Sequence, residues 1–184
     1  MYVCGGSVPT LNGRSLELRV MTADDAEALY RIWGHPQVAP WLGMPPVSSV
    51  EETRLLIDQL LDMSLEEDNL RWSILGPEGE VIGSCGYNNW QLEGAYRGEI
   101  GCELAPECWG QGVMKEALGL VLDYGFDKMG LNRIEALCHP DNGRAAGLVR
   151  SLGFRQEGIL RDYRHLPSGF QDVLLYSLLS REWQ

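Results

Sequence analysis

The hydrophobic pattern of this chain switches repeatedly between two periods, and this alternation limits the folds it can adopt. Some segments alternate polar and apolar residues, as half-buried strands do, and others space apolar residues as amphipathic helices do. The strand-like segments are 15–22, 71–76, 81–90, 97–105, 133–140, 154–164 and 170–179, and the helix-like segments are 22–33, 48–63, 112–130 and 142–154. The predicted order, β-α-α-β-β-β-α-β-α-β-β, favours an α/β (α+β) fold with helices packed on a sheet.

Length and composition indicate one domain. The chain has 184 residues, of which 45% are hydrophobic and 22% charged, and this suits a single globular domain with a substantial core. No apolar run reaches eighteen residues, and the start lacks the basic and apolar stretches of a signal peptide. We therefore expect a cytoplasmic protein without a membrane partner, in which residues 1–13 are flexible and residues 14–184 form the domain.

The formal net charge of −11 argues against a nucleic-acid partner, because phosphate backbones are bound by clustered Lys and Arg. It fits a cationic partner, although acidity alone also keeps a protein in solution. The five cysteines are odd in number and lack a C-x-x-C pair, so reduced thiols are expected. Three scattered histidines and the absence of H-E-x-x-H predict no metal site.

Two glycines, Gly110 and Gly112, flank one glutamine where a predicted strand gives way to a helix. Bare backbone and unpaired N–H groups at a helix start favour a bound anion. A Rossmann site would need a third glycine where Lys115 stands, and a P-loop would need the sequence G-x-x-x-x-G-K-[ST], which neither glycine begins. Both nucleotide motifs are excluded. A phosphate site and a simple tight turn remain as the alternatives.

The second half of the chain, "WGQGVMKEAL", "LNRIEALCHPDNGRAAGLVRSLGF" and "EGILRDYRHLPSGFQDVLLYSLL", resembles the GCN5-related N-acetyltransferase (GNAT) superfamily in order and spacing. It is most similar to the RimJ/RimL-like branch, which acetylates protein N-termini, including those of ribosomal proteins. The segments "LELRVMTADDAEAL", "HPQVAPWL" and "GEIGCELAPECWGQG" also resemble that branch, so the likeness covers essentially the whole chain. It implies a single-domain GNAT fold whose mixed central sheet, flanked by helices, is splayed between the strand ending at Ala105 and the strand starting at Arg133, with the pantetheine arm of acetyl-CoA in the splay.

The resemblance also implies which residues contact acetyl-CoA. Backbone amides from Gln111 to Lys115 would hold the pyrophosphate, amides near Glu103 and Leu104 would pair with the pantetheine, and Asn142 would bond the same arm or cap its helix. The full expected set is Cys102, Glu103, Leu104, Ala105, Gly110, Gln111, Gly112, Val113, Met114, Lys115, Asn142, Arg144 and Ala145.

Three positions depart from the family pattern. Trp109 and Met114 replace residues of the phosphate motif Q/R-x-x-G-x-G/A, but they leave the backbone donors in place. Ala145 stands where the branch often has a serine that is thought to assist the departing thiolate. The loss is small, because a thiol with a pKa of about 8.5 departs as thiolate at pH 7 for roughly 2 kcal/mol.

We expect an amine to attack the thioester directly in a ternary complex. An acyl-enzyme on Cys102 or Cys108 lacks an adjacent histidine or other base, and these side chains are better explained as small buried hydrophobes. Alternation along 97–105 puts Glu99 and Glu103 on one face, about 13 Å apart, as candidate bases. Glu99 is preferred, because several branches of the superfamily carry a glutamate about four residues ahead of the carbonyl-binding amide; both can instead be surface carboxylates that attract a cation.

The expected activity is acetyl-CoA-dependent acetylation of a primary amine, first of all a protein N-terminus, by a monomer or homodimer. The acceptor groove is expected to include His35, Trp41, Tyr163 and His165, although Trp41 and Tyr163 can equally be packing residues. Two alternatives stay open: an acetyltransferase of a free small amine such as an amino acid, polyamine or aminosugar, and a catalytically silent module that binds acyl-CoA.

Overall fold

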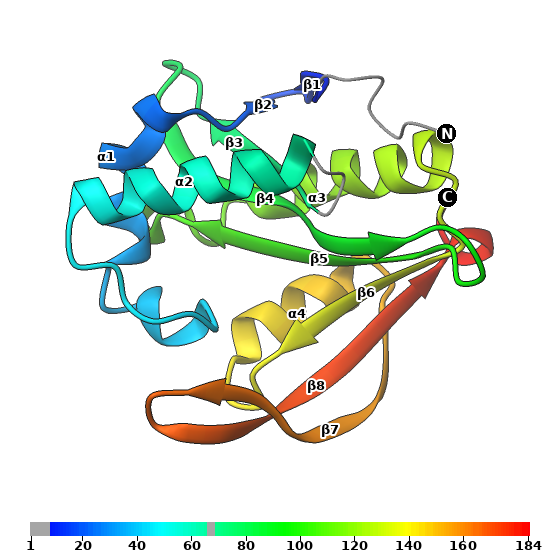
Figure 1. Cartoon of the computed structure of the whole chain (residues 1–184). Coiled ribbons are helices and arrows are strands. Elements are labelled where there is room, and N and C mark those ends of the chain that lie inside the picture. Colours follow the sequence, from blue (N-terminus) through cyan, green and yellow to red (C-terminus); the bar gives the residue numbers. More distant parts are fainter. Residues whose placement is uncertain (1–7, 66–68) are drawn as a thin grey trace.

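A single eight-stranded mixed sheet forms the centre of the molecule (Figure 1), in a computed structural model that describes residues 8–65 and 69–184. The strand order is β1-β2-β3-β4-β5-β6-β8-β7. Only β5 and β6 pair in parallel, and every other neighbouring pair is antiparallel. The strands are β1 (Leu11–Asn12), β2 (Glu17–Val20), β3 (Leu70–Leu75), β4 (Val81–Gln91), β5 (Arg97–Leu104), β6 (Arg133–Cys138), β7 (Arg155–Leu166) and β8 (Gly169–Leu179).

In the described residues, four α-helices cover both faces of this sheet. They are α1 (Ala26–Trp33), α2 (Val50–Leu65), α3 (Val113–Asp123) and α4 (Gly143–Ser151). The helices α3 and α4 share one core with Ile100 and Leu104 of β5, whereas α1 and α2 share a second core that includes Ala105. Since successive residues of a strand point to opposite faces, the two cores lie on opposite sides of β5. No helix in the described parts of the chain is long and apolar enough to cross a membrane.

This architecture confirms the predicted fold class and the predicted order of the main elements. The sequence pattern missed the short strand β1, which pairs with β2 at the sheet edge, and the short 3-10 segments Ala23–Asp25, Ala39–Trp41, Pro106–Cys108 and Ser180–Glu182. It also missed the π-helical turn Tyr124–Lys128 that follows α3. Two residues are too few to show a hydrophobic period, so β1 leaves no signal of its own.

The predicted flexible segment 1–13 lies partly outside the described residues, which begin at residue 8. Within the described part, the Trp72 indole N–H donates to the carbonyl of Pro9 at 2.7 Å. The Glu116 carboxylate on α3 accepts the backbone N–H of Ser15 at 2.9 Å and that of Arg14. These contacts fasten the turn before β2 onto α3, next to the start of the helix that lines the site described below. The boundary at residue 14 itself stays a prediction.

Candidate functional site

The sheet opens between β5 and β6, its only parallel pair. Their pairing ends at Ile100 and Ala136, whereas β5 continues along β4 as far as Leu104 and β6 continues along β8 as far as Cys138. The N–H of Ala105 donates to Ile82 on the β4 side at 2.8 Å. By alternation, the backbone groups of Cys102 and Leu104 face the opening. An extended molecule with its own amides could therefore pair with this edge as a strand would.

The glycine pair precedes α3 at the wide end of this opening. Gly110 and Gly112 have φ of 75° and 82°, a left-handed conformation that side chains other than glycine rarely adopt. A Cβ atom at either position would meet no atom within 4 Å, so conformation and not crowding requires glycine here. Gly112 is the N-cap of α3 and provides no side-chain cap for the first-turn amides. Uncapped first-turn amides favour a bound anion, so a phosphate site stays a prediction here, and the two glycines also fit the tight turn.

The second wall comes from α4. Its N-cap, Asn142, accepts the N–H of Ala145 on its side-chain oxygen at 3.0 Å, so the expected capping role is present. The amide group of that side chain still carries two N–H donors, and Asn142 also lines the cavity between the two walls. The capping contact and a contact to a ligand can therefore coexist.

A cavity of about 910 Å³ fills the space between these walls. Most of the residues expected to contact acetyl-CoA line it, from β5, from the glycine loop with the first turn of α3, and from α4. The members of the expected set that line it are Cys102, Glu103, Leu104, Gly110, Gly112, Val113, Met114, Lys115, Asn142, Arg144 and Ala145. Lining residues outside the expected acetyl-CoA set include Val38 and Leu42, from the loop expected to line the acceptor groove, and Cys108, Trp109, Leu148 and Ser151.

Two expected cofactor residues do not line this cavity. Ala105 is buried against the α1 and α2 core, and its N–H is committed to Ile82. The side chain of Gln111 donates back to the carbonyl of Glu107 at 2.7 Å. The side chain of Gln111 is therefore directed at its own loop, and Ala105 marks the end of the open edge.

Glu103 lines the cavity, but its carboxylate is already heavily hydrogen-bonded. Arg71 donates to both carboxylate oxygens at 2.8 Å, and the Trp33 indole donates at 3.0 Å. The hydroxyl of Ser84 donates as well. Side chains of Arg71 and Glu103 are only 11% and 9% exposed, so this is a buried ion pair. Because the guanidinium and its neighbours occupy both oxygens of this carboxylate, Glu103 is better suited to a structural role than to that of the base. Nothing in the sequence links Arg71 to Glu103, since the pair depends on the register of three strands.

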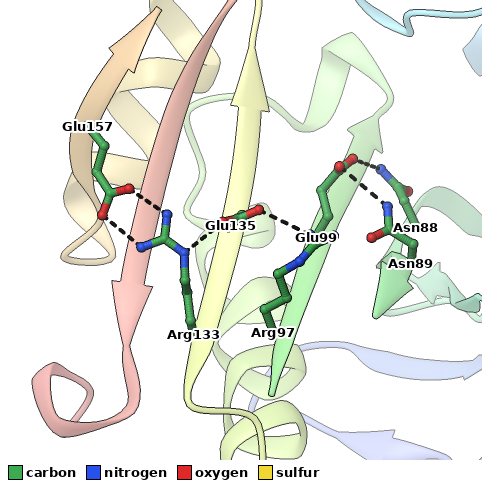
Figure 2. Close-up of polar contacts among 7 residues, drawn as sticks. All are labelled: Asn88, Asn89, Arg97, Glu99, Arg133, Glu135 and Glu157. Carbon is green, nitrogen blue, oxygen red and sulfur yellow. Dashed lines mark hydrogen bonds and ion pairs between the residues drawn. The ribbon is translucent and has the colours of Figure 1, made fainter. Parts of the chain in front are cut away.

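Glu99 lies on the same face of β5, outside the lining of the cavity. Figure 2 shows its carboxylate beside Asn88 and Asn89 of β4, which donate to it at 3.0 and 3.4 Å. Its neighbour across the parallel pair, Glu135, is neutralised by Arg133 at 2.6 Å and Arg97 at 3.4 Å. The described residues place only neutral amides, and no cation, in contact with Glu99, and each of its oxygens accepts a single hydrogen bond from them.

Asn88 also connects the two candidate carboxylates. Its side-chain oxygen accepts from Arg71 at 2.9 Å while its amide donates to Glu99. The chain of contacts runs Glu99, Asn88, Arg71, Glu103. Gly101 makes room for it, because a Cβ there would come within 2.7 Å of the Asn88 side chain. The two carboxylates, Glu99 and Glu103, are therefore coupled electrostatically through the Asn88 amide and the Arg71 guanidinium.

The cysteines near the cavity are poor nucleophiles. Burial raises the pKa of Cys102 to about 12, with Glu103 adding to the rise, and burial also raises the pKa of Cys108. Both thiols stay protonated near neutral pH, which agrees with the expectation that neither carries an acyl group. Within the described residues, no group of three or more His, Cys, Asp or Glu is arranged to hold a metal ion.

Of the predicted acceptor residues, only Trp41 lines the cavity, where its ring lies 5.5 Å from that of His139. Tyr163 is exposed on β7, and His165 stacks on Phe170 across the β7–β8 hairpin at 4.8 Å. The Nδ1 atom of His35 accepts the N–H of Gln37, beyond the end of α1. An acceptor role for these residues stays a prediction.

The loop that carries Trp41 and the β7–β8 hairpin lie against each other at one point. Gly43 has a φ of 67°, and the Arg164 guanidinium lies directly against it. A Cβ atom built on Gly43 would be only 2.3 Å from the Nη1 atom of Arg164. The two predicted parts of the acceptor groove are thus adjacent, on the side of the cavity formed by Val38, Trp41 and Leu42.

Comparison with known proteins gives a consistent result. The domain model described as "Acetyltransferase (GNAT) domain" matches residues 15–155. The uncharacterized N-acetyltransferase p20 of Bacillus licheniformis is 41% identical over 175 residues, which span 95% of this chain and 98% of p20. The ribosomal protein uS5-alanine N-acetyltransferase of Escherichia coli (strain K12) is 29% identical over 106 residues, which span 58% of this chain and 55% of that enzyme.

A solved structure of the same type is similar over nearly the whole chain. Mycobacterium smegmatis RimJ in complex with CoA-disulfide has a TM-score of 0.85 at 26% identity, covering 95% of this chain and 88% of RimJ.

Proposed function

The chain belongs to the GNAT acetyltransferase family, and from this premise we propose that it transfers the acetyl group of acetyl-CoA to the α-amine of a protein N-terminus, such as that of a ribosomal protein. It is an N-acetyltransferase, and members of this family use acetyl-CoA. The proposal adds the acceptor, direct transfer in a ternary complex, and a cytoplasmic location. The relatives named for ribosomal-protein acetylation support the choice of acceptor.

The single observation that carries the proposal is that one cavity joins an unpaired strand edge to an uncapped helix start. Acetyl-CoA has amide groups along its pantetheine arm and a pyrophosphate further along, and these need the two kinds of partner. Backbone groups of Cys102 and Leu104 would pair with the arm, and the first-turn amides of α3 would hold the pyrophosphate. The residues present therefore fit the donor.

The reaction needs little beyond position and one proton acceptor. The lone pair of the neutral amine attacks the thioester carbonyl carbon, the C–S bond breaks, and the thiolate departs with those electrons. An amide of β5 that faces the opening would stabilise the developing charge on the carbonyl oxygen. The proton released by the amine passes to a base, for which we propose Glu99, acting directly or through water.

The energy of deprotonation favours an α-amine over a lysine. At pH 7 an N-terminal amine with a pKa near 8 loses its proton for roughly 1 kcal/mol, but a lysine with a pKa near 10.4 requires about 4.6 kcal/mol. A carboxylate held by two neutral amides, as Glu99 is, is a base suited to the first task and weak for the second.

Release of free CoA thiol in the presence of matched peptides tests this function. The test peptide carries a free N-terminal alanine or serine, a basic segment and one internal lysine; its control is the same peptide with a blocked N-terminus. We expect thiol release and a mass gain of one acetyl group only with the free N-terminus. Transfer confined to free amino acids, polyamines or aminosugars would contradict the proposed acceptor. Binding of acetyl-CoA without transfer to any amine would make the chain a silent acyl-CoA module.

A further inference from the structure

Trp109, the residue before the glycine pair, has its indole fixed by contacts on both its edge and its face. Its N–H donates to the carbonyl of Leu104 at 2.9 Å, so that it fastens the glycine loop to the open end of β5. The guanidinium carbon of Arg144, from the first turn of α4, lies 4.4 Å from the centre of its ring. Trp109 also packs against both hydrophobic cores. It thus joins the two walls of the cavity and does not simply fill space.

The Arg144 guanidinium has no carboxylate partner among the described residues, in contrast to several arginines of the sheet. Arg71 and Arg133, for example, each contact a glutamate in this acidic chain. Within residues 8–65 and 69–184, the Arg144 guanidinium forms a ring contact with Trp109 and no hydrogen bond or ion pair. An aromatic face holds a cation without using its N–H donors, which remain available to a ligand.

We propose that Arg144, positioned by Trp109, is a side-chain ligand of the acetyl-CoA pyrophosphate, opposite the amides that begin α3. This inference rests on the proposed function. Arg144 and Lys115 line the cavity from its two walls, and both are exposed there. Arg144 is stacked on the residue that directly precedes the glycine loop, so its charge lies beside the anion site at the start of α3. A planar guanidinium suits two phosphate oxygens better than a mobile ammonium does.

Trp109 has a positioning role in this proposal. A free arginine side chain samples many rotamers, and stacking on a fixed ring limits it to those that face the cavity. The same indole occupies the Leu104 carbonyl, which leaves the amides of Cys102 and Leu104 as the donors that face the opening. The two contacts of Trp109 can be separated by substitution, because phenylalanine keeps a ring and loses the N–H, whereas leucine loses both.

Calorimetric affinities of Arg144→Gln for CoA and 3′-dephospho-CoA test the assignment. We expect binding of both compounds to weaken by the same factor, roughly 10- to 100-fold, because both contain the pyrophosphate. Turnover of S-acetylpantetheine, which lacks the pyrophosphate, should fall by a smaller factor than CoA affinity does. Arg161→Gln serves as the matched control, since it removes one exposed positive charge that does not line the cavity. A loss seen with CoA alone would assign Arg144 to the 3′-phosphate and overturn the proposal, as would unchanged affinity for both.

The role of Trp109 is tested by a double-mutant cycle. In the Trp109→Leu background, Arg144→Gln should cost at least threefold less CoA affinity than it does in the wild type, whereas Trp109→Phe should leave its cost nearly intact. Equal costs in all backgrounds would refute the positioning role, and thermal unfolding of each variant checks that the fold is kept. If the wild type itself binds no CoA, the proposed function fails; if it binds and Arg144→Gln binds equally well, only this inference fails.

Discussion

Glu99→Gln is expected to lower activity and Glu103→Gln to lower stability, and comparing the two variants tests the assignment of the base. Both substitutions remove one carboxylate from the same face of β5 and keep the size of the side chain. Glu99 is held by two neutral amides, whereas Glu103 is held by a buried guanidinium. The first variant should therefore lose activity and keep its stability. The second should lose stability first.

The size of the Glu99 effect follows from the proton that must leave the amine. Removal of a positioned general base typically lowers kcat by ~10²-fold or more. An α-amine with a pKa near 8 is about one-tenth unprotonated at pH 7 and almost wholly unprotonated at pH 9. Raising the pH from 7 to 9 should therefore increase the rate of Glu99→Gln about tenfold and so restore part of the lost activity. A glutamine at position 99 still accepts from one of the two asparagines, so the stability cost is about 1 kcal/mol or less.

The Glu103 effect follows from its ion pair with Arg71. Removing one partner of a buried pair leaves an uncompensated charge and costs about 3–5 kcal/mol. The buried Nε atom of Arg71 already lacks a hydrogen-bond partner among the described residues. Few acceptors near this guanidinium can therefore replace the Glu103 carboxylate. Glutamine can keep the contacts from Trp33 and Ser84, which places the expected loss at the lower end of that range.

Denaturant unfolding measures the stabilities, and steady-state thiol release from pH 6 to 9, with acetyl-CoA affinity determined separately, measures the rates. The base assignment is refuted if Glu99→Gln keeps kcat and only raises the acceptor KM, because Glu99 is then an electrostatic guide. It is also refuted if Glu103→Gln stays stable while its kcat falls and recovers at high pH, because Glu103 is then the base.

Three further outcomes are expected. Gly112→Asp should bind CoA about tenfold or more weakly than Gly112→Asn, measured by calorimetry, since both side chains share the strain of a φ of 82° and only one brings a negative charge to the anion site; equal affinities would argue against a phosphate there. Ala145→Ser should change kcat by less than tenfold in the thiol-release assay, because thiolate departure is already inexpensive at neutral pH. The Arg133 guanidinium, with the Ser177 hydroxyl, lowers the pKa of Glu157 to about 2 from its usual 4.5. The stability from this carboxylate is therefore present above pH 4.5 and lost as the pH falls toward 2. Between pH 7 and pH 3, the melting temperature of Glu157→Gln should fall less than that of the wild type.

The sequence predicted those parts of the site that depend on backbone conformation and local order. Gly110 and Gly112 stand out because only glycine readily adopts the left-handed conformation that both require before α3. Asn142 stands out because a side-chain acceptor is favoured just before a helix, and it does cap α4. Each of these signals lies within a few residues of the structure it determines.

Contacts between distant strands were beyond the reach of sequence reasoning. The pairing of Arg71 with Glu103 follows from the register of β3, β4 and β5, which no local pattern fixes. The π-helical turn after α3 also contacts a distant strand, β4. The Tyr87 hydroxyl donates to the carbonyl of Val121 at 2.9 Å and lies where a Cβ of Gly125 would be, 1.8 Å away. The sequence alone does not show that Tyr87 and Gly125 are in contact, because this depends on the fold.

The charge distribution is compatible with the two proposed substrates, acetyl-CoA and a cationic N-terminal segment, although their charges are opposite. Backbone amides at the start of α3 attract phosphate without adding to the net charge, and the proposal needs only one or two side-chain cations, Arg144 and Lys115, in support. The chain can then keep its net charge of −11, whose field favours the approach of a cationic N-terminal segment. A cluster of lysines at the donor site would repel that acceptor. An arginine held on an aromatic ring meets both demands, because its charge stays at one point beside the anion.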